Sequence, residues 1–351
     1  MGTQTTAAVI GCGAISREHL SFLSTSGDVD LVAVCDLSPA IADYTAARYG
    51  AGSAYTDHRE MLAVMRPQVV HVLTPPLSHV PLVTEALEAG CHVLCEKPIT
   101  PDTASLRELL TLAGAKDRIL METQNLRFND QLVAIDRLVR DGRLGTVVNV
   151  DLLLSIDIAH GKFADPNVPS AVANLPGGAI HDFLPHMAYL VLHFFGYPEV
   201  VDVRGSWRNV SGAPQIVFDE MEALITLPEG TASVRFSSRI QPDRFRLSVR
   251  GTEGTVETDL YQPYMRFETF RGRKQLSPLL NHAANGLSLV ASSVSNLRGK
   301  ILQHTPYHGM PRMLDAMYAA VRHGTAPPIT PLEMERTSLL IDAMAGEAVR
   351  A

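Results

Sequence analysis

The chain has 351 residues, of which 46% are hydrophobic and 19% charged, and its formal net charge is −7. That length predicts two domains at roughly 150 residues per domain, and the composition is ordinary for a globular protein. The acidic balance and the lack of any Lys/Arg block argue against a sequence-independent nucleic-acid binder and against binding to an anionic membrane surface.

The sequence favours neither a signal peptide nor a membrane helix. An apolar strand starts almost at once, at Ala7, without a basic segment or cleavage site before it. No apolar run reaches the ~18–20 residues that a membrane helix needs. The cysteines Cys12, Cys35, Cys91 and Cys95 form no C-x-x-C pair, and Cys91 and Cys95 would lie ~13 Å apart on a strand, too far for a disulfide. We therefore expect four free thiols in a cytoplasmic protein.

Up to residue 122 the sequence alternates apolar strands and helices. We expect strands at residues 7–11, 31–36, 69–74, 92–95 and 119–122, and helices at 16–24, 39–49, 81–89 and 103–113. Continuous apolar strands between helices are typical of a parallel sheet that is covered on both faces. In such a sheet ligands bind at the carboxyl ends of the strands.

Beyond residue 122 the pattern changes to longer, alternating strands. We expect strands at residues 146–158, 199–209, 220–227, 231–238, 244–251 and 254–259, and helices at 129–140, 180–195, 283–303, 310–323 and 331–349. These elements predict an α+β domain over residues 123–351, with an open, mainly antiparallel sheet and the 180–195 helix on one side. The last two helices could also pack back on the first domain. The place of the 283–303 helix stays open, and for residues 287–297 a packing helix is favoured over a membrane contact.

The segment GCGAIS, residues 11–16, follows the first strand and opens a helix. Gly11 permits a tight turn, and Gly13 lets a pyrophosphate approach the backbone at the helix N-terminus. Ser16 stands where the dinucleotide-binding fingerprint has Gly or Ala, a mild departure. We expect the turn to contact a dinucleotide through Gly11, Gly13, Ala14 and Ile15. Residues 1–122 are therefore interpreted as an α/β Rossmann domain.

Asp36 ends the second strand, where an acidic side chain would hold the ribose hydroxyls. A carboxylate at this place repels a 2′-phosphate, and neither Leu37 nor Ser38 supplies a positive charge. The sequence therefore favours NAD(H) over NADP(H).

Four segments together resemble the glucose–fructose oxidoreductase/inositol dehydrogenase (Gfo/Idh/MocA) family. They are AVIGCGAIS, CDLSP, TPPLSHVPLVTEALEAGCHVLCEKPIT and GGAIHDFLPH, in this order. The Glu96-Lys97-Pro98 step after a Rossmann half is specific to this family. The resemblance implies sugar, polyol or related substrates, a second domain whose sheet forms the substrate wall, and a homodimer or homotetramer.

The resemblance also implies roles for individual residues. Lys97 would contact the reacting hydroxyl and the nicotinamide ribose, Asp182 would hold the substrate, and His186 would transfer the proton. The other cofactor-binding residues would be Thr74, Pro75, His79, Glu96 and Gln124. Further candidates for substrate contacts are Arg127, His181, Tyr307 and His308.

The chemistry of these residue types fits hydride transfer from a secondary alcohol. Such a reaction needs a base for the hydroxyl proton and a cation for the developing alkoxide charge. Histidine titrates near neutrality, and positions four apart share a helix face, so Asp182 and His186 could converge. Pro185 lies between them and would remove a helical hydrogen bond. We therefore expect the helix to begin near Leu184 or to be kinked there.

Other interpretations stay open at this point. Lys97 could be a solvated lysine at a strand end, and His186 a core histidine. His160, His181, His186 and His193 suggest a metal site, but without an H-E-x-x-H motif or a cysteine at ligand spacing we expect no metal.

We expect an NAD(H)-dependent dehydrogenase or reductase acting on CH–OH groups of a sugar-like compound. The alternatives are a redox glycosidase or lyase that recycles its NAD, and a non-catalytic NAD-binding regulator. The sequence leaves the substrate open, because loops without a motif, such as residues 162–176, shape the pocket.

Overall fold

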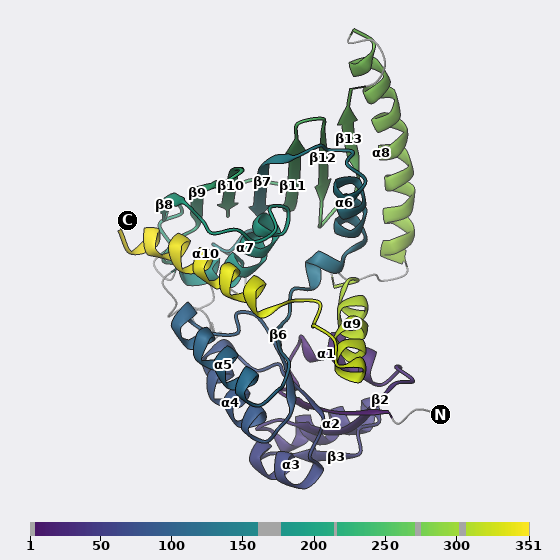
Figure 1. Ribbon diagram of the computed structural model, residues 1–351, viewed down its shortest axis with the longest axis vertical. Coiled ribbons are helices and arrows are strands. Elements are labelled where there is room, and N and C mark those ends of the chain that lie inside the picture. The colour runs from purple at the N-terminus through teal and green to yellow at the C-terminus, as the bar shows by residue number, and fades with distance from the viewer. Residues whose placement is uncertain (1–3, 161–176, 214–215, 271–274, 302–306, 351) are drawn as a thin grey trace. The chain divides into compact units, whose positions relative to one another are not determined.

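The chain forms two compact units (Figure 1). The computed structural model describes residues 4–160, 177–213, 216–270, 275–301 and 307–350. Unit 1 comprises residues 1–125 and 309–338, and unit 2 comprises residues 126–308 and 339–351. The loop at residues 162–176, which we expect to shape the substrate pocket, lies outside the described residues.

Unit 1 is built on a six-stranded parallel sheet in the order β3-β2-β1-β4-β5-β6. This is the strand order of the Rossmann fold and confirms the predicted fold class. Its strands are β1 (Thr5–Ile10), β2 (Val29–Cys35), β3 (Ser53–Tyr55), β4 (Val69–Val72), β5 (His92–Cys95) and β6 (Leu120–Glu122). Its helices are α1 (Ser16–Leu23), α2 (Pro39–Tyr49), α3 (His58–Met65), α4 (His79–Glu88), α5 (Thr103–Ala115), α9 (Met310–His323) and the first part of α10 (Pro331–Arg350).

Local sequence explains most of these elements and also the two that sequence reasoning missed. The four residues of β4 are all buried, as a central parallel strand requires. Helix α2 begins with Pro39 behind an N-cap Ser38 and ends at Gly50 in the left-handed conformation. The missed β3 is a three-residue edge strand whose side chains are only half-buried, so it has no apolar run. The missed α3 follows directly and is capped by Asp57.

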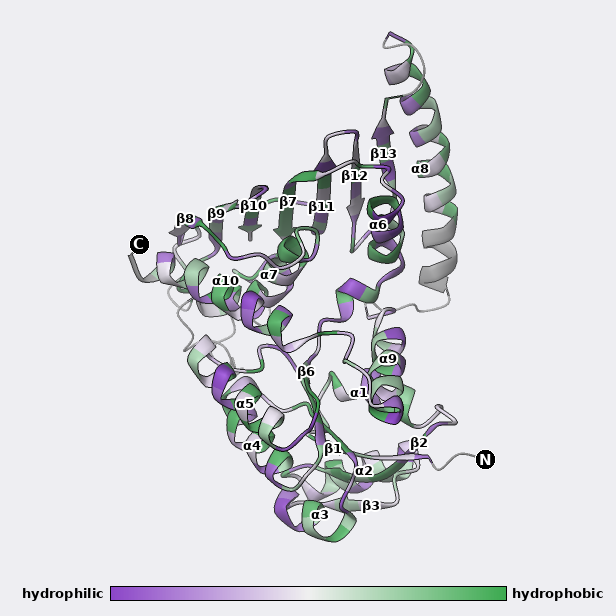
Figure 2. Cartoon of the chain, in the orientation of Figure 1, coloured by the Kyte–Doolittle hydropathy of each residue, from purple (hydrophilic) through white to green (hydrophobic). Residues whose placement is uncertain are grey.

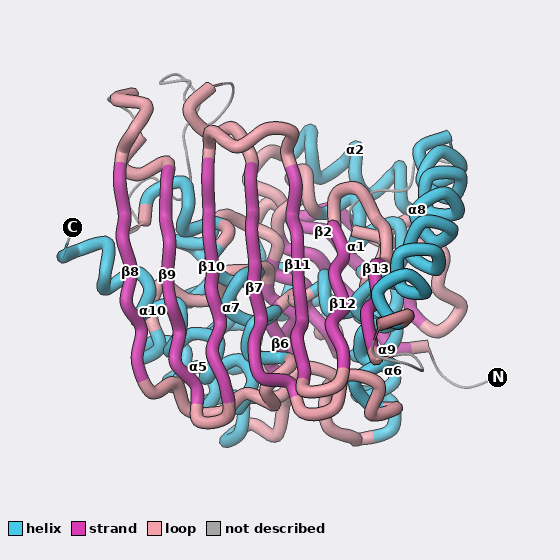
Figure 3. Tube along the Cα trace, turned by 90° about the horizontal axis from the view of Figure 1, so that it is seen from above, coloured by secondary structure: helices cyan, strands magenta, loops and turns pink. Residues whose placement is uncertain are grey.

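Unit 2 contains a seven-stranded sheet in the order β13-β12-β11-β7-β10-β9-β8 (Figure 3). Its strands are β7 (Val147–Ser155), β8 (Asp202–Arg208), β9 (Glu220–Leu227), β10 (Gly230–Ser237), β11 (Arg244–Gly251), β12 (Gly254–Asp259) and β13 (Arg266–Thr269). The sheet is mainly antiparallel, as expected, but β7 and β10 pair in parallel. Whether two strands pair in parallel depends on which strands become neighbours in the sheet. The alternation of side chains along each strand does not show this, so the sequence could not predict the parallel pair.

The helices of unit 2 are α6 (Asp130–Arg140), α7 (Leu184–His193) and α8 (Ser277–Ile301), together with the end of α10. Helix α7 is apolar almost all round and packs on the buried side chains of β7, such as Leu152. It begins at Leu184, as expected from Pro185, and not at residue 180, so Pro185 lies in the first turn, where a missing N–H costs nothing. Helix α8 begins six residues earlier than the sequence pattern indicated.

A buried chain of polar side chains crosses the core of unit 1. His19 on α1 contacts the Glu96 carboxylate through Nε2 at 3.2 Å, and its Nδ1 lies 2.9 Å from Nδ1 of His71. The Nε2 atom of His71 lies 2.9 Å from the Tyr318 hydroxyl on α9. Both histidines are fully buried and Tyr318 is almost fully buried. Buried polar groups persist only when each finds a partner, and this chain satisfies all four.

The hydrogen bonds of this chain run in one direction when both rings are neutral. A carboxylate only accepts, so His19 donates from Nε2 to Glu96 and its Nδ1 is an acceptor. His71 must therefore donate from Nδ1, and its Nε2 accepts from the Tyr318 hydroxyl. The donors thus point from Tyr318 towards Glu96, which orients one carboxylate oxygen from inside the core.

We expect the stability of unit 1 to fall below neutral pH because of His71. Burial, and then the neighbouring His19, hold the pKa of His71 well below its ordinary value. Above pH 6.5 neither the folded nor the unfolded chain protonates this ring. Below pH 6.5 only the unfolded chain takes up the proton, so the free energy of unfolding falls by about 1 kcal/mol per pH unit.

Urea unfolding at pH 7.5 and pH 5.5 measures this effect. His71→Gln should lose less stability between the two pH values than the natural chain does, whereas His323→Gln, at an exposed histidine of α9, should behave like the natural chain. Equal losses in His71→Gln and the natural chain would contradict the assignment.

Candidate functional site

The carboxyl ends of the parallel strands of unit 1 meet at one edge of the sheet. Backbone hydrogen bonds join neighbouring strand ends: the Gly11 N–H donates to the Cys35 carbonyl at 2.8 Å, and the Glu96 N–H donates to the Val72 carbonyl at 2.9 Å. The predicted residues Gly11, Asp36 and Glu96 each directly follow one of these strands. The structure therefore brings the expected cofactor residues of unit 1 to the edge where such sheets bind ligands.

The turn after β1 requires glycine at its first position. Gly11 has a φ of +94°, and a Cβ there would lie 2.8 Å from Cγ2 of Thr74. At Gly13 a Cβ would meet no atom within 4 Å, so the space above the turn is open. Ser16 donates its hydroxyl to the Gly13 carbonyl at 2.7 Å, which gives the departure from the fingerprint a local role. Ala14 and Ile15 complete the turn, and α1 begins at Ser16.

Asp36 is fixed by two backbone N–H groups. One carboxylate oxygen accepts from Cys12 at 2.9 Å and the other from Ser38 at 2.9 Å. The neighbouring Leu37 is 94% exposed and uncharged, so the residue beside Asp36 adds no positive charge to this edge of the turn. A glycine cradle, a helix N-terminus and a held carboxylate are the groups that the diphosphate and the ribose of NAD require. The residues present therefore fit NAD.

The segment after β4 braces the Glu-Lys-Pro step. His79 is fully buried, and its Nδ1 lies 2.8 Å from the Pro98 carbonyl oxygen and its Nε2 2.7 Å from that of Thr74. Burial dominates, so the pKa of His79 lies below its ordinary value, although the two carbonyl oxygens favour the imidazolium. Thr74 also accepts a hydrogen bond from Ser78, and Pro75 is exposed at the start of the loop. The His79 ring thus ties this loop to the segment that carries Lys97.

Glu96 is buried and ionised beside a half-buried Lys97. Burial alone raises the pKa of Glu96, but the hydrogen bond and electrostatic interaction with His19, together with the Lys97 ammonium, outweigh it, so that pKa is lowered. The second carboxylate oxygen accepts the Lys97 backbone N–H at 3.2 Å. The carboxylate is therefore held on two sides, from the core by His19 and from the loop by Lys97.

Glu122 is a second buried acid at this edge, and sequence reasoning missed it. It ends β6, accepts the Ile99 N–H at 3.1 Å and lies 3.3 Å from the amide nitrogen of the predicted Gln124. Burial raises the pKa of Glu122, in the direction opposite to that of Glu96. The available signal was an acid at the carboxyl end of an apolar strand. His19, His71 and Tyr318 were missed as well, although His71 interrupts an otherwise apolar strand.

Unit 2 carries the predicted Asp182, His186 and His181. Asp182 ends a short 3₁₀ helix, Gly178–Asp182, and His186 lies in the first turns of α7. The His186 Nδ1 atom lies 2.7 Å from the hydroxyl of the buried Tyr189, which orients the ring. His181 is buried, its Nδ1 has no hydrogen-bond partner among the described residues, and burial lowers its pKa to about 4. His181 is therefore neutral at physiological pH.

The remaining candidates of unit 2 lie near the two ends of its first segment, residues 126–308. The Arg127 guanidinium carbon is 5.3 Å from the centre of the Tyr197 ring, which indicates a cation–π contact. His308 accepts the Asp130 backbone N–H at 3.3 Å, and Tyr307 is 37% exposed.

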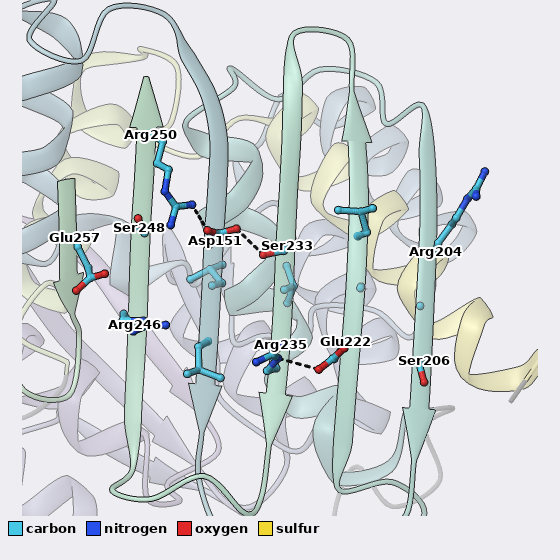
Figure 4. Close-up of a pocket in the computed structure, with 16 residues that line it drawn as sticks. Asp151, Arg204, Ser206, Glu222, Ser233, Arg235, Arg246, Ser248, Arg250 and Glu257 are labelled. Carbon is cyan, nitrogen blue, oxygen red and sulfur yellow. Dashed lines mark hydrogen bonds and ion pairs between the residues drawn. The ribbon is translucent and has the colours of Figure 1, made fainter. Parts of the chain in front are cut away.

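A polar groove lies on the face of the unit 2 sheet (Figure 4). Several of its charged side chains are paired: Arg250 contacts Asp151, Ser233 donates to Asp151 at 2.5 Å, and Arg235 lies 2.9 Å from Glu222. None of the catalytic or substrate candidates is among the residues that line it. The groove is therefore a separate feature from the predicted site.

The described residues show two further absences. Among them no group of three or more His, Cys, Asp and Glu side chains could hold a metal ion. No helix in the described part of the chain is long and apolar enough to cross a membrane.

Comparison with known proteins gives two family matches and several relatives. Residues 5–124 match the model described as an oxidoreductase family with an NAD-binding Rossmann fold, and residues 132–257 match the GFO/IDH/MocA C-terminal domain. The chain is 33% identical over 202 residues to D-glucoside 3-dehydrogenase of Escherichia coli, which covers 56% of this chain and about half, 55%, of that protein. It is 26% identical to inositol 2-dehydrogenase of Rhizobium meliloti, over 73% of this chain and 76% of that protein.

A solved structure shares the fold over the full length. It is the WlbA dehydrogenase from Bordetella pertussis in complex with NADH and UDP-GlcNAcA, with a TM-score of 0.80, 18% identity, and coverage of 100% of this chain and 97% of that chain. With both family models matched and the NAD-binding turn in place, the chain belongs to the Gfo/Idh/MocA family of NAD-binding oxidoreductases.

Proposed function

We propose that the protein is an NAD(H)-dependent dehydrogenase that interconverts a hydroxyl and a ketone on a sugar, cyclitol or sugar-like substrate. The observation that carries the proposal is Lys97, beside a carboxylate fixed from two sides, at the sheet edge that also holds the dinucleotide turn. The names of the relatives, a glucoside and an inositol dehydrogenase, support a polyhydroxylated substrate.

In this proposal unit 1 binds the cofactor and unit 2 supplies the substrate wall. Gly11, Gly13 and the start of α1 hold the diphosphate, and Asp36 holds the adenine ribose. Bound NAD supplies a hydride acceptor or donor at nicotinamide C4. His79 has an indirect role, because its ring contacts the Pro98 and Thr74 carbonyl oxygens and so fixes the loop that carries Lys97.

The proposed chemistry divides two tasks between the units. The Lys97 ammonium stabilises the negative charge that develops on the substrate oxygen in the low-dielectric site. His186, oriented by Tyr189, takes the hydroxyl proton during oxidation and returns it during reduction. Asp182 holds a neighbouring hydroxyl or orients His186. Arg127, His181, Gln124, Tyr307 and His308 remain proposed contacts of the substrate or cofactor.

We also propose a cytoplasmic location. Cys12, Cys35, Cys91 and Cys95 are all free thiols in the structure, which a reducing compartment favours.

Asp36→Asn should shift the cofactor preference towards NADPH. The carboxylate of Asp36 is held in place by two N–H groups and would face a 2′-phosphate as a like charge. We expect the ratio of the NADPH Kd to the NADH Kd to fall about tenfold or more, since like charges in contact cost several kcal/mol. Calorimetric titration of both cofactors measures the ratio.

Asp30→Asn is the matched control, because Asp30 lies exposed on the same strand, β2. Its ratio should equal that of the natural chain. A natural chain that binds NADPH more tightly than NADH would contradict the assignment of Asp36.

Lys97→Met should remove turnover while NADH binding stays largely intact. Methionine keeps the length of the side chain but removes the charge that stabilises the alkoxide, and loss of one such group costs about 10²–10³ in kcat. A panel of sugars, cyclitols and their keto forms with NAD(H), followed by NADH absorbance, measures turnover. Lys116→Met, at an exposed lysine that ends α5, should retain full activity.

Wild-type turnover in Lys97→Met would disprove the role of Lys97. Cleavage of a glycosidic bond without net formation of NADH would instead identify the enzyme as an NAD-recycling glycosidase.

A further inference from the structure

Helix α8 of unit 2 is amphipathic in the opposite sense to an ordinary surface helix. It packs along the edge strand β13 (Figure 3). Ordinarily the apolar stripe of such a helix faces the protein and the polar residues face water. In α8 the residues that face the sheet are polar, and the residues on the other side are apolar.

The buried face of α8 is a polar stripe that caps the open edge of the sheet. Ser277 and Asn281, which are 6% and 7% exposed, donate to the Thr269 carbonyl at 3.1 and 2.9 Å. Asn285 accepts the Phe267 N–H at 3.0 Å, and Ser288 donates to the Met265 carbonyl at 2.9 Å. These contacts occupy backbone groups of the edge strand that would otherwise need another strand as partner. The polar stripe therefore fixes which side of α8 faces outward.

The outward face of α8 is an exposed apolar stripe. Leu279, Leu280, Leu287, Val290 and Val294 are 68%, 49%, 76%, 66% and 52% exposed. Together they present on the order of 600 Å² of side chain, at the upper end of the largest apolar patch on a typical monomer. Green, apolar residues recur along α8 in Figure 2. A patch of this size marks an interaction surface.

The apolar residues of α8 have the spacing of residues that pair two helices, and we call this row of residues the seam. Leu276, Leu280, Ala283, Leu287, Val290 and Val294 are separated alternately by four and three residues. In the sequence Leu297 and Ile301 continue the same spacing. Apolar residues in this 4-3 repeat pack as knobs into the holes of a second helix with the same repeat. The seam therefore fits a helix better than it fits a flat surface or a small ligand.

The lack of charged residues along the seam favours a second copy of α8 as the partner helix. Residues 275–297 contain no Asp, Glu, Lys or Arg, whereas about 25–35% of a protein surface is ordinarily charged. In a two-fold symmetric contact each patch meets its own copy, so a charge near the axis would face a like charge. An uncharged seam avoids that repulsion. An interfacial membrane helix would instead carry Lys and Arg along its polar face, whereas in the sequence of α8 they occur only near its end, at Arg298 and Lys300, and the chain has a net charge of −7.

We propose that the outward face of α8 is the contact through which two copies of this chain associate. The two α8 helices pair along the seam from Leu276 to Val294 about a two-fold axis. Such a pair would bury most of the exposed apolar stripe, and the area approaches the ~800 Å² per partner of a standard interface. The proposal concerns only unit 2 and is independent of the proposed function.

Leu287→Glu and Leu289→Glu form a matched pair for testing the proposal. Leu287 is the most exposed residue of the seam, whereas Leu289, which is 43% exposed, points away from the seam on the same helix. Both variants place the same charge on the same helix. Sedimentation equilibrium over about 1–100 μM, the range in which tenfold changes in a dimer Kd are visible, measures the mass of each. Far-UV circular dichroism checks that each variant is folded.

We expect the natural chain and Leu289→Glu to have at least twice the 38.1 kDa mass of one chain. Leu287→Glu should have half the mass of the natural chain, or a Kd raised at least tenfold. A natural chain that is monomeric throughout the range would overturn the proposal, as would Leu287→Glu assembling like the natural chain. A monomer that co-sediments with phosphatidylcholine vesicles would assign the seam to a membrane instead.

Discussion

The candidate site of unit 1 depends on one constraint: parallel strands all end at the same edge of their sheet. The turn after β1, the carboxylate after β2 and the Glu-Lys step after β5 lie far apart in sequence, and backbone hydrogen bonds between strand ends bring them together. The constraint also explains the glycine at position 11. The turn leaves its strand directly against Thr74, where no side chain fits. The sheet alone therefore determines the positions of the candidate cofactor-binding residues, without any ligand.

The same edge is supported from inside the core. Tyr318 and His71 hold His19 in the state that donates to Glu96, and Glu96 in turn accepts the Lys97 N–H. Helix α9, far along the chain from β5, thus connects to the candidate site through hydrogen bonds within unit 1. The pKa values of the buried acids Glu96 and Glu122 shift in opposite directions, because hydrogen bonds and nearby charges outweigh burial at Glu96 and do not outweigh it at Glu122. A fixed environment around Lys97 is what electrostatic stabilisation requires.

Features that depend on local sequence could be predicted, whereas features that depend on contacts between distant segments could not. The apolar strands, the glycine turn and the acid at Asp36 have signals of their own, and the structure places them at one edge. The parallel pairing of β7 with β10 and the chain from Glu96 to Tyr318 have no such signal, because their partners are distant in sequence. Helix α8 was predicted without a place in the fold. Its inverted polarity becomes visible only once β13 shows which face is covered.

The central claim is that Lys97 of unit 1 and His186 of unit 2 act on the same substrate oxygen. The most direct measurement is a crystal structure of the chain with NAD⁺ and a polyol that reduces it. We predict that the reacting hydroxyl lies within about 2.6–3.2 Å of both the Lys97 Nζ atom and a ring nitrogen of His186. A hydroxyl positioned for hydride transfer that contacts neither side chain would contradict the account.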